Sequence, residues 1–177
     1  MTPMVDESLA ATGQRIDDLE ARIRVHTPER RLSMRRHAVA LRHEQANALA
    51  AARRAPAQTT DERAARLRSR LEVAEHSLDA DLAEDRSAFT AAVEAELESW
   101  DRFIERLLTR AAEQTGPARD HAEAAITALR RQRISVNGRL DAVRAAGWNT
   151  WREERTRVSA ARDQLAQMAD DLSATLY

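Results

Sequence analysis

The histidines are the side chains through which this chain would most readily bind a metal, and their spacing argues against it. A ferritin-like di-iron site in a helical bundle needs Glu-x-x-His motifs on two helices. None of the five histidines follows a carboxylate by three residues: they are His26, His37, His43, His76 and His121. No His-x-x-x-His pair occurs, so a helical zinc site is not expected either. We therefore expect no metal site and no cofactor.

Other common catalytic groups are also missing from the sequence. It contains no cysteine and no lysine, because all 28 basic residues are arginine. These absences exclude a cysteine nucleophile, Schiff-base chemistry and a P-loop lysine. Neither Gly-x-Gly nor Gly-x-Ser-x-Gly occurs, so the usual phosphate cradle and nucleophile elbow are absent. We expect no enzymatic activity and no small-molecule substrate.

The candidate binding patch is an arginine-rich segment, residues 28–55, with seven arginines and two glutamates. Such a cluster could contact the phosphates of a nucleic acid, with Arg42 beside His43, or lie on an anionic membrane as an amphipathic helix. The alternative is that the arginines neutralise the acidic third helix, in which residues 61–113 carry 14 acids and 8 arginines, or are solvated, which the net charge of −1 favours. No aromatic residues are interleaved to stack on bases. The patch comprises Arg30, Arg31, Arg35, Arg36, Arg42, Arg53 and Arg54.

The three tryptophans divide into two kinds by their place in the helical pattern. Trp100 and Trp151 fall in rows of apolar residues spaced three and four apart, which indicates core packing. Trp148 falls outside its row. Because exposed aromatic residues are enriched in protein interfaces, Trp148 is a candidate contact residue.

The composition and spacing predict an all-α protein. Ala, Glu, Leu and Arg make up 97 of the 177 residues, which is typical of long helices or coiled coils. One apolar row runs from Leu67 to Ala111, with Asp85 as its single charged member, and a second runs from Ala122 to Leu176. These rows predict two long helices, about 60–114 and 117–176, joined at Thr115-Gly116-Pro117. Gly147 indicates a local unwinding or mild kink in the second helix.

An antiparallel hairpin of these helices about Gly116 would pair residues whose numbers sum to about 231. Phe89 should then meet Leu140 or Val143, and Trp100 should lie near Leu129 or Arg133. Trp151 should pack against Leu78 or Leu82. The alternative is one continuous helix, kinked at Pro117, that pairs with another chain.

The N-terminal part shows weaker patterns. A heptad row predicts a helix over residues 5–26, and Thr27-Pro28 indicates either a new helix or a kink. In residues 28–55 the predicted apolar stripe is thin: Leu32, Val39, Ala46 and Leu49. We predict an elongated antiparallel helical bundle or coiled coil, in which the N-terminal helices pack as a third, kinked arm. The expected domains are residues 1–56 and 57–177.

Part of the sequence resembles a known family. Residues 140–165 contain Ala-Ala-Gly147-Trp-Asn-Thr-Trp151, a charged stretch, and then Val158, Ala161 and Leu165. This stretch resembles the C-terminal signature of small bacterial coiled-coil proteins labelled stress-responsive, and residues 98–104 resemble the preceding helix of actinobacterial members. The resemblance covers about residues 72–172 and does not include residues 1–56. It implies an association with stress and supplies no catalytic residues.

Together these observations favour a non-enzymatic structural or interaction protein that forms a homodimer, because pairing subunits would bury more of a thin apolar stripe. The alternatives are an electrostatic nucleic-acid binder acting through residues 30–54, or a peripheral lipid-binding bundle. No apolar run approaches the ~18 residues of a membrane span, and the N-terminus lacks the pattern of a signal peptide. We therefore expect a cytoplasmic protein.

Overall fold

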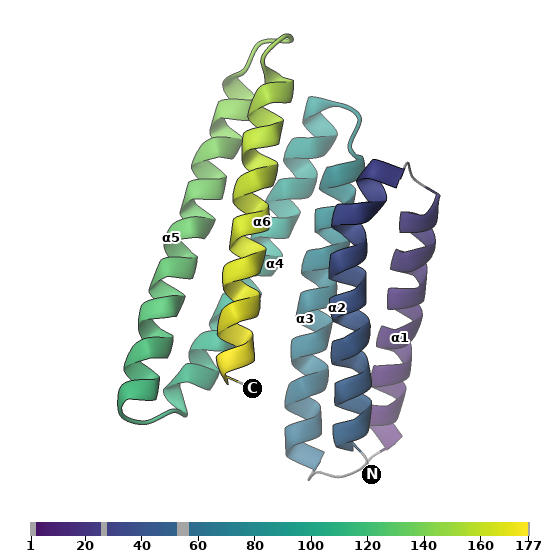
Figure 1. The fold of residues 1–177 in the computed structure, drawn as a ribbon, viewed down its shortest axis with the longest axis vertical. Coiled ribbons are helices and arrows are strands. Elements are labelled where there is room, and N and C mark those ends of the chain that lie inside the picture. Colours follow the sequence, from purple (N-terminus) through teal and green to yellow (C-terminus); the bar gives the residue numbers. More distant parts are fainter. Residues whose placement is uncertain (1–2, 26–27, 53–56, 177) are drawn as a thin grey trace. The chain divides into compact units, whose positions relative to one another are not determined.

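The computed structural model describes residues 3–25, 28–52 and 57–176, with side chains for residues 9–25, 38–50 and 61–176. All regular structure in these ranges is helical, so the all-α prediction is confirmed (Figure 1). The described helices are α1 (Pro3–Arg24), α2 (Pro28–Ala52), α3 (Ala57–Leu82), α4 (Arg86–Ala112), α5 (Pro117–Ala145) and α6 (Trp151–Leu176). None of them is long and apolar enough to span a membrane.

The chain divides into two compact units, Met1–Leu78 and Asp79–Tyr177. We refer to them as the N-terminal unit and the C-terminal unit. The boundary lies inside α3, near its C-terminal end, whereas the sequence analysis placed a boundary between residues 56 and 57. The last turn of α3 therefore belongs to the C-terminal unit.

In the N-terminal unit, α1 and α2 lie side by side and run in opposite directions (Figure 1). The prediction of one kinked arm is therefore wrong. Arg42 of α2 reaches back to Asp17 and Glu20 of α1, which places the middle of one helix against the middle of the other. The helix α2 begins at Pro28, whose fixed φ suits the first turn of a new helix.

The buried face of α2 is not the predicted one. Val39 is 67% exposed and Leu49 is 36% exposed, while Ala38, Leu41 and Ala48 are buried. Small side chains on this face allow close approach to α1: a Cβ placed on Gly13 would lie 2.4 Å from Nε2 of Gln45. The helix turns its small residues inward because they permit this close packing, at the cost of exposing larger ones.

The C-terminal unit contains a three-helix bundle of α4, α5 and α6, in which each helix runs opposite to the one before it (Figure 1). The predicted arrangement of two long helices is not confirmed. The first predicted helix is interrupted between Leu82 and Arg86, and the second between Ala145 and Trp151. At Gly147 the chain reverses direction instead of kinking, so α6 packs back along α5, with Gln132 Nε2 donating to the carbonyl oxygen of Ala161 at 2.9 Å.

The predicted hairpin about Gly116 exists between α4 and α5, in a shifted register. The ion pairs Asp101–Arg133, Glu105–Arg130 and Glu94–Arg144 join residues whose numbers sum to 234, 235 and 238, against the predicted 231. Gly116 makes the reversal with φ of 59°, a conformation that suits glycine. Nearly all members of the predicted rows on these three helices are buried, including Phe89, Trp100 and Trp151.

Candidate functional site

Arg42 is the patch arginine whose side chain the structure describes, and it contacts its own unit. Its Nε donates to Oε1 of Glu20 at 2.9 Å, NH2 also contacts Asp17, and NH1 donates to Oε1 of Gln45 at 3.2 Å. The hydrogen bonds to Glu20 and Asp17 raise the pKa of Arg42. Its neighbour His43 is exposed and shares a hydrogen bond with Asn47.

The other patch arginines fall outside the described side chains. The backbone of α2 includes four of them, and two lie in the undescribed residues 53–56. In order, they are Arg30, Arg31, Arg35, Arg36, Arg53 and Arg54.

The charge pairing that the structure describes runs opposite to the expected one. An acidic residue of α2, Glu44, pairs with two arginines of α3, Arg66 and Arg70, at 2.8 Å each. The arginine of α2, Arg42, pairs with acids of α1. Arg15 of α1 makes a two-pronged contact with Glu75 of α3, at 3.1 and 2.6 Å. Ion pairs therefore connect all three helices of the N-terminal unit.

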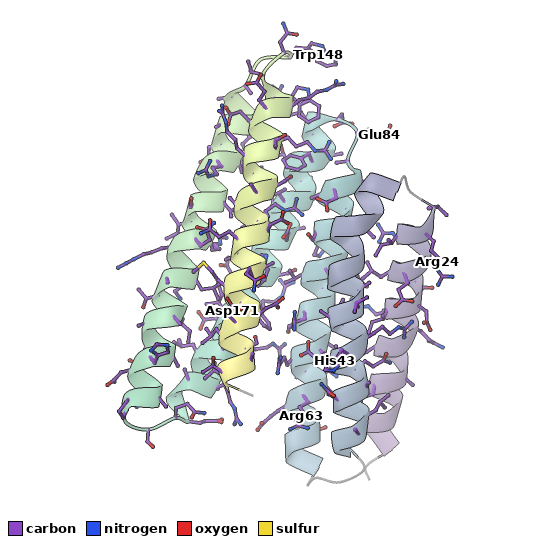
Figure 2. The ribbon with its side chains drawn as sticks, viewed as in Figure 1. Arg24, His43, Arg63, Glu84, Trp148 and Asp171 are labelled. Carbon is purple, nitrogen blue, oxygen red and sulfur yellow. The ribbon has the colours of Figure 1, made fainter. Side chains whose placement is uncertain are left out.

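Trp148 is 86% exposed, as its position outside the apolar row predicted. It lies in the short turn between α5 and α6, at one end of the C-terminal unit, and Figure 2 shows it beyond the helix ends. Arg86, at the start of α4, contacts the carbonyl oxygen of Ala146, so the α3–α4 and α5–α6 turns lie at the same end. Ile134, on α5, is the other large apolar side chain of this unit that is well exposed, at 66%.

A buried ionic cluster lies inside the three-helix bundle, and the sequence analysis missed it. Arg162 of α6 donates from Nε to Oε2 of Glu96 on α4 at 2.6 Å and from NH1 to Oδ1 of Asp81 on α3 at 3.0 Å. The other carboxylate oxygen of Glu96 accepts a hydrogen bond from Nε1 of Trp100 at 3.2 Å. Arg162 is 4% exposed and Glu96 is 2% exposed.

Burial and ion pairing shift the pKa values of Glu96 and Arg162 in opposite directions. Burial raises the pKa of Glu96, and the nearby Arg162 opposes that shift. For Arg162, burial acts to lower the pKa, but the attraction of Glu96 and Asp81 raises it overall, so the guanidinium stays charged. Both carboxylate oxygens of Glu96 have side-chain partners, and through Arg162 the cluster connects α3, α4 and α6.

A second arginine of α6, Arg155, binds the C-terminal end of α3. Its guanidinium donates to the carbonyl oxygens of Ala83, Ala80 and Asp81 at 2.6, 3.1 and 2.9 Å. The same group lies 5.0 Å from the ring centroid of Phe89 and 5.9 Å from that of Trp151, within the range of cation–π contacts. The last carbonyls of a helix lack intrahelical partners, and Arg155 supplies donors for them.

The positions of Glu96 and Arg162 carry a signal that could have revealed the cluster. On α4, Glu96 lies three residues after Val93 and four before Trp100, in a second helical row that continues to Phe103. On α6, Arg162 stands four residues after Val158 and three before Leu165. A charged residue at a core position of each of two packed helices, with opposite signs, indicates a buried pair. No comparable signal identifies Arg155, because its acceptors are backbone atoms.

Among the residues whose side chains are described, no group of three or more histidines and carboxylates could hold a metal ion. Comparisons of the chain with protein-family models, with curated proteins and with solved structures found no match.

Proposed function

We propose that the protein is a non-enzymatic helical interaction protein that associates with a second copy of itself through the end of the C-terminal unit that presents Trp148. The exposure of Trp148 is the observation that supports this proposal most directly. Removing a tryptophan from water is favourable, and tryptophan is among the residues that contribute most to protein interfaces. The two other tryptophans are buried and already contribute to the fold.

The surroundings of Trp148 support a role outside the fold of its own chain. The turn is fixed by Arg86 on the carbonyl oxygen of Ala146 and by the amides of Thr150 and Trp151, which donate to the carbonyl oxygen of Gly147 at 3.1 Å each. A side chain presented on such a fixed turn loses little conformational freedom when it binds. The resemblance of residues 72–172 to stress-responsive coiled-coil proteins is the basis for proposing a stress-associated role.

The test compares the oligomeric mass of the full chain, 19.9 kDa per copy, with that of Trp148→Ala in sedimentation or light scattering. We expect a dimer for the natural sequence and a shift toward monomer for the variant. Ile134→Ala, which removes the other exposed apolar side chain of the unit, is the matched control and should leave the mass unchanged. A monomer for the natural sequence at micromolar concentration would contradict the proposal.

The alternatives, nucleic acid or an anionic membrane bound through the arginine patch, make a different prediction. Binding should then weaken steeply as salt is raised, and an Arg30/Arg31/Arg35/Arg36→Gln variant should lose it. At low salt, a gel shift detects binding to nucleic acid and a vesicle flotation assay detects binding to an anionic membrane. Dimerisation through Trp148 should be insensitive to that variant.

A further inference from the structure

The link between α3 and α4 breaks a helix where the local sequence does not require a break. Its residues are Ala83, Glu84 and Asp85, with neither glycine nor proline among them. Alanine and glutamate both favour helix. The apolar row also continues across the link in steps of three and four, from Leu82 through Asp85 to Phe89. Specific side-chain contacts must therefore stabilise the break.

Asp85 supplies the first of these contacts. It is the N-cap of α4, with an extended backbone (φ −120°, ψ 167°), and its Oδ1 accepts a hydrogen bond from the amide of Ala88 at 2.8 Å. An aspartate in this position favours starting a new helix over continuing an old one, because its side chain replaces a missing backbone acceptor. The charged residue in the apolar row is thus the residue that starts α4.

Arg155 supplies the second contact, and it does so by occupying the acceptors that a continuous helix would need. In such a helix, the amides of Glu84, Asp85 and Ser87 would donate to the carbonyl oxygens four residues earlier, those of Ala80, Asp81 and Ala83. These are the three carbonyl oxygens to which Arg155 donates. In the broken link, Arg155 therefore supplies donors to the three carbonyl oxygens that the continuous helix would satisfy with its own amides.

We propose that the α3–α4 link is a conformational switch, in which Arg155 and Asp85 stabilise the break and their release joins α3 and α4 into one helix over residues 57–112. Arg155 comes from α6, so the state of the link depends on the packing of the last helix of the chain. In the continuous state the backbone satisfies its own hydrogen bonds across residues 83–87. This proposal is independent of any partner and does not rest on the proposed function.

The test is hydrogen exchange and backbone NMR on the full-length Asp85→Ala/Arg155→Gln variant. We expect the amides of Glu84, Asp85, Arg86 and Ser87 to exchange about tenfold or more slowly than in the natural protein. The Cα chemical shifts of residues 83–85 should move to helical values, and α4, α5 and α6 should stay protected. The matched control is Arg157→Gln, which removes a surface arginine of α6 paired only locally with Glu154 in the described contacts and should change none of these amides.

Unchanged or faster exchange at those four amides, with α4–α6 still protected, would overturn the proposal. If the double variant loses protection throughout α4–α6, Asp85→Ala alone provides the decision, because it removes one of the two contacts that stabilise the break and keeps Arg155 for the packing of α6. A smaller gain of protection at residues 84–87 in that variant supports the switch, and no gain overturns it.

Discussion

The two units are built from the same few residue types and both have an apolar core, and the most deeply buried of the described ion pairs lies in the C-terminal unit. In the N-terminal unit, the described interior of α2 is Ala38, Leu41 and Ala48, and ion pairs connect the helices. The side chains in those pairs range from 13% exposed for Glu44 to 66% for Asp17. In the C-terminal unit, α4 alone buries ten residues, and the side chains of its Glu96–Arg162 pair are only 3% and 4% exposed.

The difference shows that burial, and not the number of arginines and acids, decides what an ion pair contributes. A pair open to water gains little, because the attraction is weak in a high dielectric and is screened by salt. A buried pair has already lost its hydration, so removing one partner leaves an uncompensated charge in the core. We therefore expect substitutions in the two units to differ strongly in effect.

The largest effect is expected for Arg162→Leu. It leaves Glu96 buried without its main partner, and losses of this kind amount to about 3–5 kcal/mol. Urea unfolding followed by circular dichroism measures the change. A loss under about 1 kcal/mol would show that the cluster is hydrated in solution and that its apparent burial has little energetic meaning.

The double variant Glu96→Leu/Arg162→Leu sharpens the same point. Because it removes both buried charges, it should cost much less than the two single substitutions together, as replacing a buried pair by apolar residues often does. A double variant whose cost equals the sum of the single costs would mean that the two side chains act independently.

Trp151→Ala should destabilise the C-terminal unit by about 3 kcal/mol or more, as large-to-small core changes do. Trp151 is 6% exposed, and the substitution also removes its contact with Arg155. Trp148→Ala should cost far less, because Trp148 is 86% exposed. Equal losses in thermal unfolding would contradict the assignment of one tryptophan to the core and the other to the surface.

The sequence predicted the buried faces of α4, α5 and α6 better than that of α2, because their rows contain large apolar residues. In α4, α5 and α6 such residues occupy steps of three and four, and burial follows that pattern. In α2 the inward face includes small residues such as Ala38 and Ala48 beside Leu41, and periodicity of large residues cannot identify such a face. That is why Val39 and Leu49 were wrongly assigned to the stripe.

The two helix breaks, at Gly147 and at residues 83–85, also differ in how well the sequence predicted them. Gly147 indicated an interruption, although spacing alone could not show that the chain reverses there. The break at residues 83–85 has no local glycine or proline, and Asp85 was its only sign. It depends on Arg155, which lies 72 residues along the chain from Ala83. The exposure of Trp148 could be predicted because exclusion from an apolar row is visible in the sequence, whereas Arg155 binds backbone atoms that every residue shares.

The pH dependence of stability also tests the burial of Glu96, and we expect its effect to be smaller than those of the core substitutions above. Its folded-state pKa is raised above the ordinary 4.5 by burial, so its contribution is fully present below the unfolded pKa and is lost as the pH rises through the folded pKa. Relative to Glu96→Gln, the natural protein should therefore lose unfolding free energy as the pH rises above the ordinary value of 4.5. A relative gain with rising pH would mean that Arg162 lowers this pKa below its ordinary value.

The smallest effect is expected for Arg15→Gln in the N-terminal unit. Its side chain is 40% exposed and that of Glu75 is 27% exposed, so removing the pair should cost no more than about 1 kcal/mol. The cost should shrink further at high salt. Chemical unfolding at two salt concentrations measures both values, and a loss comparable to that of Arg162→Leu would remove the distinction between the units.

The claim that the Glu96–Arg162 pair is buried while the ion pairs between α1 and α2 are open to water is tested most directly by hydrogen exchange at low and high salt. Raising sodium chloride from about 0.05 M to about 1 M shortens the Debye length several-fold and weakens exposed pairs far more than buried ones. Amides of α1 and α2 should lose more protection than the amides of α4 and α6 around Glu96 and Arg162. Equal losses in both regions, or a larger loss around Glu96 and Arg162, would contradict the claim.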